Sequence, residues 1–551
     1  MKKNNRIFQL LKKNLISQKG MALLATLIFV FILTSLGIAL LTMTRNDIKL
    51  STLQEESTKA FYLADAGVER AVNWLEKQGT PPSLEDIPPV NFDGNHDFDE
   101  LSTGKYTILL SVGADPASTV AGYIIETKGW ITRADASRVS RKIKTMVTIN
   151  NFAEYAYFSN QELFPNNPNI SGSGSYAGQK IWFIGDDIFG GRVHSNSQFH
   201  MVDEPNFYGK VTSTADTIEF WGGAHAADGH DFPNFHDDYD LGVPNIPLPQ
   251  FSEISNLDDD KSLQRIAGGS LGKSGIQALP SNGVYVPSVG GMGTQATGGI
   301  YVKGNVTSIN LDVDNAVDPN SKITFFQGVN KTTITSVLSP ITLPAGSTLN
   351  DVVLAVETSI PANTTLVKKP TGVDVYESYQ GISNGLLFVD GSINDLNGNN
   401  QRGKMTIASN ESINITNNIL YYDRDETVSL LNDEHLKDID DSLGLVAAKD
   451  VKIASNAPYN IEVDAIIMAL NTSFFYTGWQ GPGLKGTLSL LGGLIQKERG
   501  PVGTHNAGVK VSGYSKNYQY DTRMANPAGG KLPPYFPSTG KYQKVYWKEV
   551  Y

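Results

Sequence analysis

The chain has 551 residues, a formal net charge of -11 and only 18% charged residues, with 53 glycines, 26 prolines and no cysteine. The absence of cysteine excludes disulfides, thiolate metal sites and thiol nucleophiles. The negative charge argues against a nucleic-acid polycation, and the many turn-forming residues indicate a mostly β protein with several domains.

The first 43 residues have the charge pattern of a membrane-crossing segment. Residues 1–20 carry six basic side chains and no acid, and residues 21–43 carry no charge. About 20 helical residues cross the hydrocarbon layer, so residues 21–43 are predicted to span the membrane once. The basic flank places the N-terminus in the cytoplasm. The apolar run is longer than a secretory signal core, and no small-residue cleavage site follows it.

The helical pattern continues beyond this span. Residues 1–80 contain no proline, and residues 79–82 (Gly-Thr-Pro-Pro) predict a helix end. A helix over residues 21–77 would be about 85 Å long. Apolar side chains recur at helical spacing in its second half: Ile48, Leu53, Ala60, Leu63, Ala64, Val68, Ala71, Trp74 and Leu75.

The N-terminal region resembles a type IV prepilin with a class III signal, and residues 60–70 (AFYLADAGVER) are similar to PilX-type minor pilins. The resemblance implies that residues 1–20 are a leader, which prepilin peptidase removes between Gly20 and Met21, and that Met21 is then N-methylated. It also implies that the helix first anchors the chain in the inner membrane and then packs with major and minor pilins in a fibre. A plain single-pass anchor on a surface protein is the alternative interpretation.

Position 25 departs from the pattern of the major pilins. Those proteins carry a glutamate at the fifth residue of the mature chain, where this sequence has Ala25. That carboxylate is thought to pair with the terminal amine of the neighbouring subunit, and an unpaired buried charge is costly. Its replacement therefore favours a position at or near the fibre tip, where one neighbour is missing.

Residues 78–150 predict the small antiparallel sheet that follows the helix in pilins, because residues 105–113, 122–132 and 138–149 alternate apolar and polar side chains in parts of each segment. The chain beyond residue 150 shows short strands separated by glycine-containing turns and no amphipathic helix. This pattern favours a β-solenoid; a β-sandwich is the alternative. We expect the solenoid over residues 151–309 and 381–520, an inserted β subdomain at 310–380, and a basic and aromatic tail at 521–551.

Short motifs extend the resemblance over nearly the whole chain. Residues 190–196 (GGRVHSN), 205–213 (PNFYGKVTS), 299–304 (GIYVKG), 500–504 (GPVGT) and 513–518 (GYSKNY) resemble a large uncharacterised domain that follows a PilX-like N-terminus in several bacterial groups. The order of these motifs is a stronger signal than any single one.

No constellation of residues supports catalysis. Residues 269–274 (GSLGKS) lack the first glycine of a phosphate loop, and residues 381–385 (GISNG) precede a strand-like run instead of the helix that a nucleophile elbow needs. Histidine and aspartate gather before residue 241, and this pair of residue types suits zinc or another divalent ion. The candidate ligands are His230, Asp231, His236 and Asp237, without any fixed ligand spacing. A solvated acidic loop is the alternative, and we expect neither enzyme activity nor a cofactor.

The C-terminal 67 residues carry ten lysines or arginines and three acids, with aromatic residues between them. Cations interleaved with aromatic rings suit sugar-phosphate backbones and unstacked bases; an ordinary solenoid surface is the alternative. The candidate DNA-binding residues are Lys497, Arg499, Lys510, Lys516, Arg523, Lys541, Lys544, Lys548, Tyr518 and Trp547.

The sequence as a whole predicts a minor type IV pilin at or near the pilus tip. It would prime assembly and present a β-rich head to a cell, a host or another surface. One alternative is a DNA-binding tip pilin for natural transformation, similar in layout to ComZ-type competence pilins. A second alternative is a membrane-anchored β-helix that acts on polysaccharides.

Overall fold

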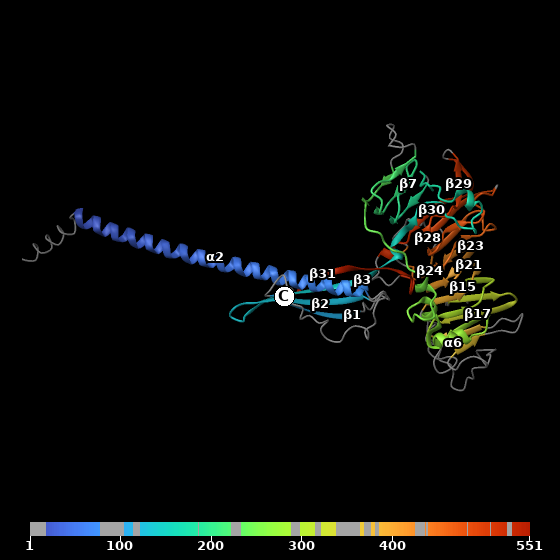
Figure 1. Cartoon of the computed structure of the whole chain (residues 1–551), viewed down its shortest axis with the longest axis horizontal. Coiled ribbons are helices and arrows are strands. Elements are labelled where there is room, and N and C mark those ends of the chain that lie inside the picture. The colour runs from blue at the N-terminus through green and yellow to red at the C-terminus, as the bar shows by residue number, and fades with distance from the viewer. Residues whose placement is uncertain are drawn as a thin grey trace, which may run out of the picture.

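A long helix and a large β-rich head form the two ends of the molecule, and a small sheet lies along the helix between them (Figure 1). This is a computed structural model of the chain. The residues that it describes are 18–77, 104–113, 122–185, 187–221, 233–287, 298–313, 321–337, 364–367, 376–380, 385–424, 436, 439–481, 483–506, 509–525 and 532–550.

Helix α2 (Gln18–Lys77) runs unbroken for 60 residues, about 90 Å at 1.5 Å per residue. Its first half is apolar all round, and the large apolar side chains between Met21 and Met43 are 50% to 70% exposed. The helix is long and apolar enough to cross a membrane. The predicted extent of this helix, residues 21–77, is confirmed to within three residues.

The second half of α2 buries one stripe of its surface. Ala60, Ala64, Val68 and Ala71 have no exposed surface, and their spacing of three or four residues places them on one face. They face strand β2 (Gly122–Thr132) and its neighbours. The helix approaches β2 so closely at Gly129 that a Cβ there would lie 2.3 Å from the backbone oxygen of Ala60. The buried stripe starts later along the helix than predicted, since Ile48, the first residue of the predicted stripe, is 62% exposed.

The sheet against α2 has four antiparallel strands in the order β1-β2-β3-β31. Strands β1 (Gly104–Gly113) and β3 (Arg138–Asn151) flank β2. The fourth strand, β31 (Ser538–Val550), comes from the end of the chain and pairs with β3, where Trp547 lies opposite Thr145. Residues 538–550 of the segment expected to be a tail over 521–551 therefore form a structural strand. We call residues 18–151 and 538–550 the helix–sheet module and residues 152–537 the head.

The head contains many short strands and a few short helices. The helices are α3 (Ser173–Tyr176), α4 (Phe251–Ile254), α5 (Leu263–Gly268) and α6 (Gly272–Ala278), with 3-10 turns η1 (Phe152–Glu154), η2 (Gly269–Leu271) and η4 (Thr522–Ala525). The strands are β4 (Tyr155–Gln161), β5 (Ile188–Phe189), β6 (Arg192–Ser195), β7 (His200–Met201), β8 (Asn206–Phe207), β9 (Val211–Ser213), β10 (Glu219–Phe220), β11 (Asn234–Phe235), β12 (Tyr239–Leu241), β13 (Gly283–Pro287), β14 (Ile300–Lys303), β15 (Ser308–Val313), β16 (Ser321–Gln327), β17 (Asn330–Val337), β18 (Thr364–Val367), β19 (Tyr376–Gln380), β20 (Leu386–Asp390), β21 (Ile393–Gln401), β22 (Lys404–Ser409), β23 (Ile413–Tyr421), β24 (Ser442–Ala447), β25 (Val451–Ile453), β26 (Ile461–Ala469), β27 (Phe474–Tyr476), β28 (Leu484–Glu498), β29 (Gly503–Asn506) and β30 (Val509–Tyr520).

Parallel ladders run through the head and form what we call the stack. The longest follows the order β14-β20-β22-β24-β26-β28-β4-β6-β9-β12, and each neighbouring pair is parallel. A second parallel ladder follows β15-β21-β23-β25-β27, and a third follows β28-β30-β5-β8-β11. Antiparallel pairing occurs in the meander β15-β16-β17, which overlaps the range 310–380 expected for an inserted subdomain, and also where β13 pairs with β14 and β18 and where β29 pairs with β30.

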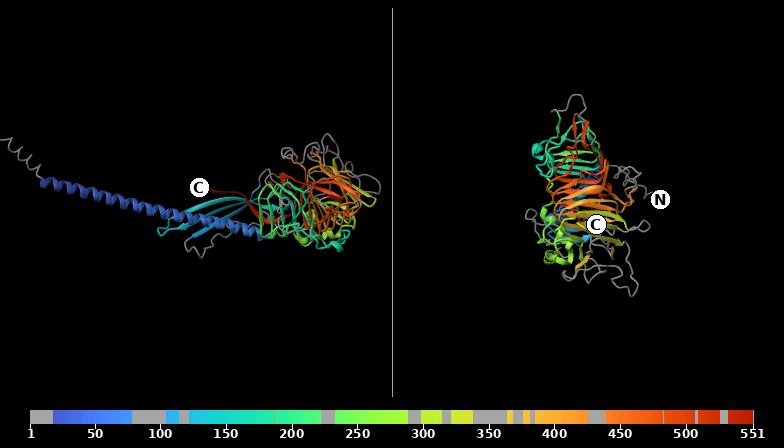
Figure 2. Two further views of the ribbon diagram at one scale, coloured as in Figure 1. Left: turned by 90° about the horizontal axis from the view of Figure 1, so that it is seen from above. Right: turned by 90° about the vertical axis from the view of Figure 1, so that its right-hand side faces the viewer.

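The chain joins the stack in its middle. Strand β3 leads through η1 into β4, which lies between β28 and β6. The chain then builds the stack as far as β12, passes α4 to α6, and returns from β14 to β28. The head is therefore elongated across the direction of α2 (Figure 1 and Figure 2). A large apolar cluster fills the stack, and a second cluster joins β4, α5 and the turn η4 outside it.

Candidate functional site

The residues of the predicted processing site lie at the start of α2. Gly20 and Met21 fall within its first turns, and Ala25 is exposed on the same apolar half. Nothing in the described part of this chain packs over that half, since the membrane-length window of the helix is wholly unburied.

Several predicted DNA-binding residues lie in the interior of the head. Arg499 and Lys516 form buried ion pairs with Glu162 at 2.8 Å and with Asp187 at 2.6 Å. Arg523 pairs with Asp521 at 2.5 Å and is 7% exposed. Tyr518 belongs to the apolar core of the stack, and Lys510 donates hydrogen bonds to the backbone carbonyls of residues 485 and 486. These side chains stabilise the fold and do not form an exposed surface.

The other predicted DNA-binding residues are spread over two places. Lys541, Lys544, Trp547 and Lys548 belong to β31 of the helix–sheet module. Lys544 pairs with Glu69 of α2, and the ring of Trp547 meets Phe61 edge-on at 5.7 Å. Lys497 is half-buried at the end of β28 in the head. The structure thus does not bring the ten predicted residues together.

The predicted metal ligands are only partly described. His230 and Asp231 lie outside the described residues. His236 stacks on Tyr208 with a ring distance of 4.1 Å, and Asp237 is exposed. Within the described ranges, no group of three or more histidines and acids is arranged to hold a metal ion.

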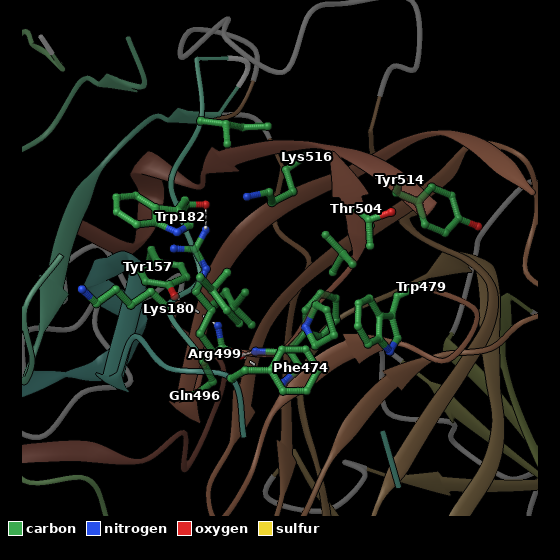
Figure 3. A pocket seen from close by; sticks show the side chains of 18 of the residues that line it. Tyr157, Lys180, Trp182, Phe474, Trp479, Gln496, Arg499, Thr504, Tyr514 and Lys516 are labelled. Atoms are coloured by element: carbon green, nitrogen blue, oxygen red, sulfur yellow. Dashed lines mark hydrogen bonds between the residues drawn. The ribbon is translucent and has the colours of Figure 1, made fainter. Parts of the chain in front are cut away.

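A cavity of about 590 Å³, which we call the aromatic cleft, lies where the two parts of the stack meet, the first built from β4 to β12 and the second from β14 to β30. Tyr157 of β4 and Leu494 of β28 both line it, and these two residues are paired across the junction of the strands. Figure 3 shows Lys180 and Trp182 on one side of the cavity and Trp479 on the other. The volume is in the range of small-molecule binding sites.

Aromatic rings surround the cleft in two groups. Trp182 and Trp221 meet edge-on at 5.0 Å, and Trp221 is 62% exposed. Phe164, Tyr176 and Trp479 form the other group, with ring distances of 5.2 to 5.6 Å. Trp479 is 4% exposed, and its Nε1 has no hydrogen-bond partner among the described residues.

Each of the three cations that line the cleft has a carboxylate partner. Lys180 pairs with Glu219, and Arg499 and Lys516 form the two buried pairs described above. The guanidinium of Arg499 also lies 3.8 Å from the ring centre of Phe183. Burial lowers the pKa of Lys516, while the Asp187 carboxylate opposes that shift. The positive charges in the wall of the cleft are therefore each matched by a negative charge.

Sequence reasoning did not identify the aromatic cleft. It selected cations and tyrosines near the C-terminus, whereas the tryptophans of the cleft stand at positions 182, 221 and 479. These positions are far apart along the chain, and pairings between distant strands, such as β28 with β4 and β10 with β7, bring them together. No local spacing carries that information.

Comparisons with known proteins give two matches. Residues 123–215, which run from β2 to just beyond β9, match a family described as Domain of unknown function (DUF4900). The crystal structure of the competence-associated pilin ComZ from Thermus thermophilus matches at 12% identity, over 90% of this chain and 98% of that chain, with a TM-score of 0.28. No curated protein matches the sequence.

Proposed function

We propose that this protein is a pilin-type subunit of PilX-like layout that carries a binding head out of the membrane. The observation that carries the proposal is the division of α2 into an uncovered apolar half and a half packed on a small antiparallel sheet. Apolar side chains exposed to this extent are unfavourable in water. A bilayer before assembly, and the helices of other pilins after it, would cover them.

The processing expected of such a subunit follows from its N-terminus. Prepilin peptidase cuts between Gly20 and Met21 and removes the basic leader, and the new terminal amine is methylated. The precursor crosses the inner membrane once with its N-terminus in the cytoplasm, the side on which basic flanks stay. Its partners are the peptidase, the major pilin and other minor pilins.

We place the subunit at or near the fibre tip and assign it a role in priming assembly. Ala25 lacks the carboxylate with which a major pilin is thought to pair its neighbour's terminal amine. The width of the head supports the same position, because the head extends across the direction of α2 (Figure 1). A subunit inside the fibre would have to fit this width between its neighbours.

We further propose that the head is a β-solenoid whose role is to bind a surface or a cell, without catalysis. Its three ladders of parallel strands support this architecture over a sandwich, since sandwiches are built from antiparallel sheets. Adhesion is favoured over DNA capture, because Arg499, Lys516 and Arg523 are engaged in buried ion pairs.

The experiment measures the processing of the precursor in the membrane and the position of the head on the fibre. Gly20→Val should leave an uncleaved precursor in the membrane fraction, seen as a larger intact mass without methylated Met21. The matched control is Gly37→Ala, because a Cβ at Gly37 meets no atom of the described residues within 4 Å; it should be processed normally. Gold-labelled antibodies against the head should mark fibre ends.

Two results would reject the proposal. Normal processing of Gly20→Val would leave a plain membrane anchor as the better interpretation. Labelling along the whole fibre would reject the tip position while leaving the pilin assignment intact.

A further inference from the structure

We propose that the aromatic cleft binds a neutral sugar residue of a surface polysaccharide. This inference names the ligand class of the head, and it rests on the proposed function only for where the head is displayed.

The mouth of the cleft offers flat apolar surface. The ring of Trp221 is 62% exposed, although it packs edge-on against Trp182 at 5.0 Å. A sugar ring has faces made of C–H groups, so that it can cover an indole ring without removing its own hydroxyls from hydrogen-bonding partners. An exposed tryptophan at the mouth of a cavity is therefore suited to a saccharide.

The wall of the cleft contains an unused donor. The indole Nε1 of Trp479 is buried and has no acceptor in the described part of the chain. A buried tryptophan N–H usually finds a partner, and leaving it without one is unfavourable. Its Nε1 has no surface open to the cavity, so a ligand oxygen would supply the missing acceptor only after the indole ring shifts toward the cleft.

The polar groups of the lining are both donors and acceptors. Gln179, Lys180 and Asp203 line the cleft and are exposed, so that they lie toward its opening. An amide, an ammonium and a carboxylate together present donors and acceptors side by side. A sugar hydroxyl both donates and accepts, and it can use such a mixture.

The charge balance argues for a neutral ligand. Each lining cation has a carboxylate partner, and Asp203 adds a further carboxylate. A nucleic-acid backbone depends on cations that are free to neutralise its phosphates. The cleft does not supply such an excess, so a neutral saccharide fits it better than DNA.

The test uses the full-length protein in detergent micelles. Neutral hexasaccharides of the malto, cello, chito, xylo and manno series are titrated by calorimetry at low and high salt, and a single-stranded oligothymidine is titrated in parallel. At least one hexasaccharide should bind with an affinity that does not change with salt. Trp221→Ala should weaken that binding about tenfold or more, the size typical of a central contact residue, and Trp221→Tyr should retain most of it.

The matched control is Trp547→Ala, which also removes one partly exposed tryptophan but lies in the helix–sheet module. It should bind the saccharide as the unaltered chain does. The proposal is overturned if none of the five hexasaccharides binds, or if Trp221→Ala binds as well as the control. Salt-sensitive oligothymidine binding that Trp221→Ala abolishes would assign the cleft to nucleic acid instead.

This outcome is independent of the processing experiment. Saccharide binding by a chain whose Gly20→Val variant is processed normally would retain the sugar site and remove the pilin assignment. A chain that is processed as proposed but binds no saccharide would retain the pilin assignment and remove the sugar site.

Discussion

Arg499 shows at the scale of single residues how an arginine can belong to the fold instead of a binding surface. Its guanidinium donates to Glu162 at 2.8 Å and to the backbone oxygen of Trp182 at 3.2 Å, and it lies over Phe183. Glu162 has no exposed surface and also accepts hydrogen bonds from Tyr157 and Ser159. The arginine therefore neutralises a carboxylate that has no access to water.

The first prediction concerns this pair. Arg499→Met should lower the free energy of unfolding of the head by about 3–5 kcal/mol, because it leaves the buried Glu162 without a cation. Lys497→Met is the matched control two residues away, on a half-buried side chain, and should cost less than about 1 kcal/mol. Urea denaturation followed by tryptophan fluorescence measures both.

A double variant separates the lost charge from lost packing. Arg499→Met combined with Glu162→Gln should recover part of the stability, since the uncompensated charge is then removed. Equal stability of the single and double variants would contradict the role assigned to the ion pair.

The sequence alone does not show that these cations are buried. The alternation of cations and aromatic rings around Arg499 and Lys516 predicts a DNA surface there. Their partners, Glu162 and Asp187, precede them by more than 300 residues. Residue type and spacing cannot distinguish a lysine in a buried pair from one in solvent.

At the scale of elements, helix α2 can be predicted from the sequence, whereas the pairing of strand β31 cannot. The helix was predicted from its apolar period and the absence of proline, both of which are local signals. Residues 541–550 (KYQKVYWKEV) are rich in aromatic and β-branched side chains, which is also a local strand signal. The partner strand β3 lies about 400 residues earlier, so the sequence alone predicts only a basic and aromatic tail.

The second prediction tests whether β31 is structural. Truncation after Pro537 should raise amide hydrogen exchange in β3, which would lose the hydrogen bonds of one neighbour. The rings of Tyr542 and Trp547 would also be lost from Tyr123 and Phe61, which they contact at 5.6 and 5.7 Å. Exchange followed by mass spectrometry resolves the peptide that contains β3.

Lys544→Gln is the control for this truncation. It removes only the ion pair with Glu69, whose side chains are 36% and 61% exposed, and exposed pairs contribute about 1 kcal/mol or less. Exchange in β3 should then be unchanged. If truncation also left β3 protected, β31 would be the dispensable tail that its composition suggests.

At the scale of the whole molecule, the order in which the chain builds the stack was unpredictable. Glycine-containing turns between short strands predicted a repetitive β architecture. They carry no information that β4 inserts between β28 and β6, because a strand buried in a parallel sheet reads as a plain apolar run. This insertion joins the two parts of the stack to each other and, through η1 and β3, to the helix–sheet module.

The third prediction tests that junction. Gly493 lies in β28, and a Cβ at this position would come within 2.2 Å of the backbone oxygen of Tyr155 in β4. Gly493→Ala should therefore push β4 away from β28 and lower stability by about 1–3 kcal/mol, as overpacking does. Gly174→Ala is the control, since a Cβ there lies more than 4 Å from every atom outside its own helix in the described part of the chain. Hydrogen exchange should rise in β4 and β28 together, because each is the neighbour that protects the other. A rise confined to β28 would mean that β4 stays protected without β28, and the junction would then be held by other contacts, such as the pairing of β30 with β5.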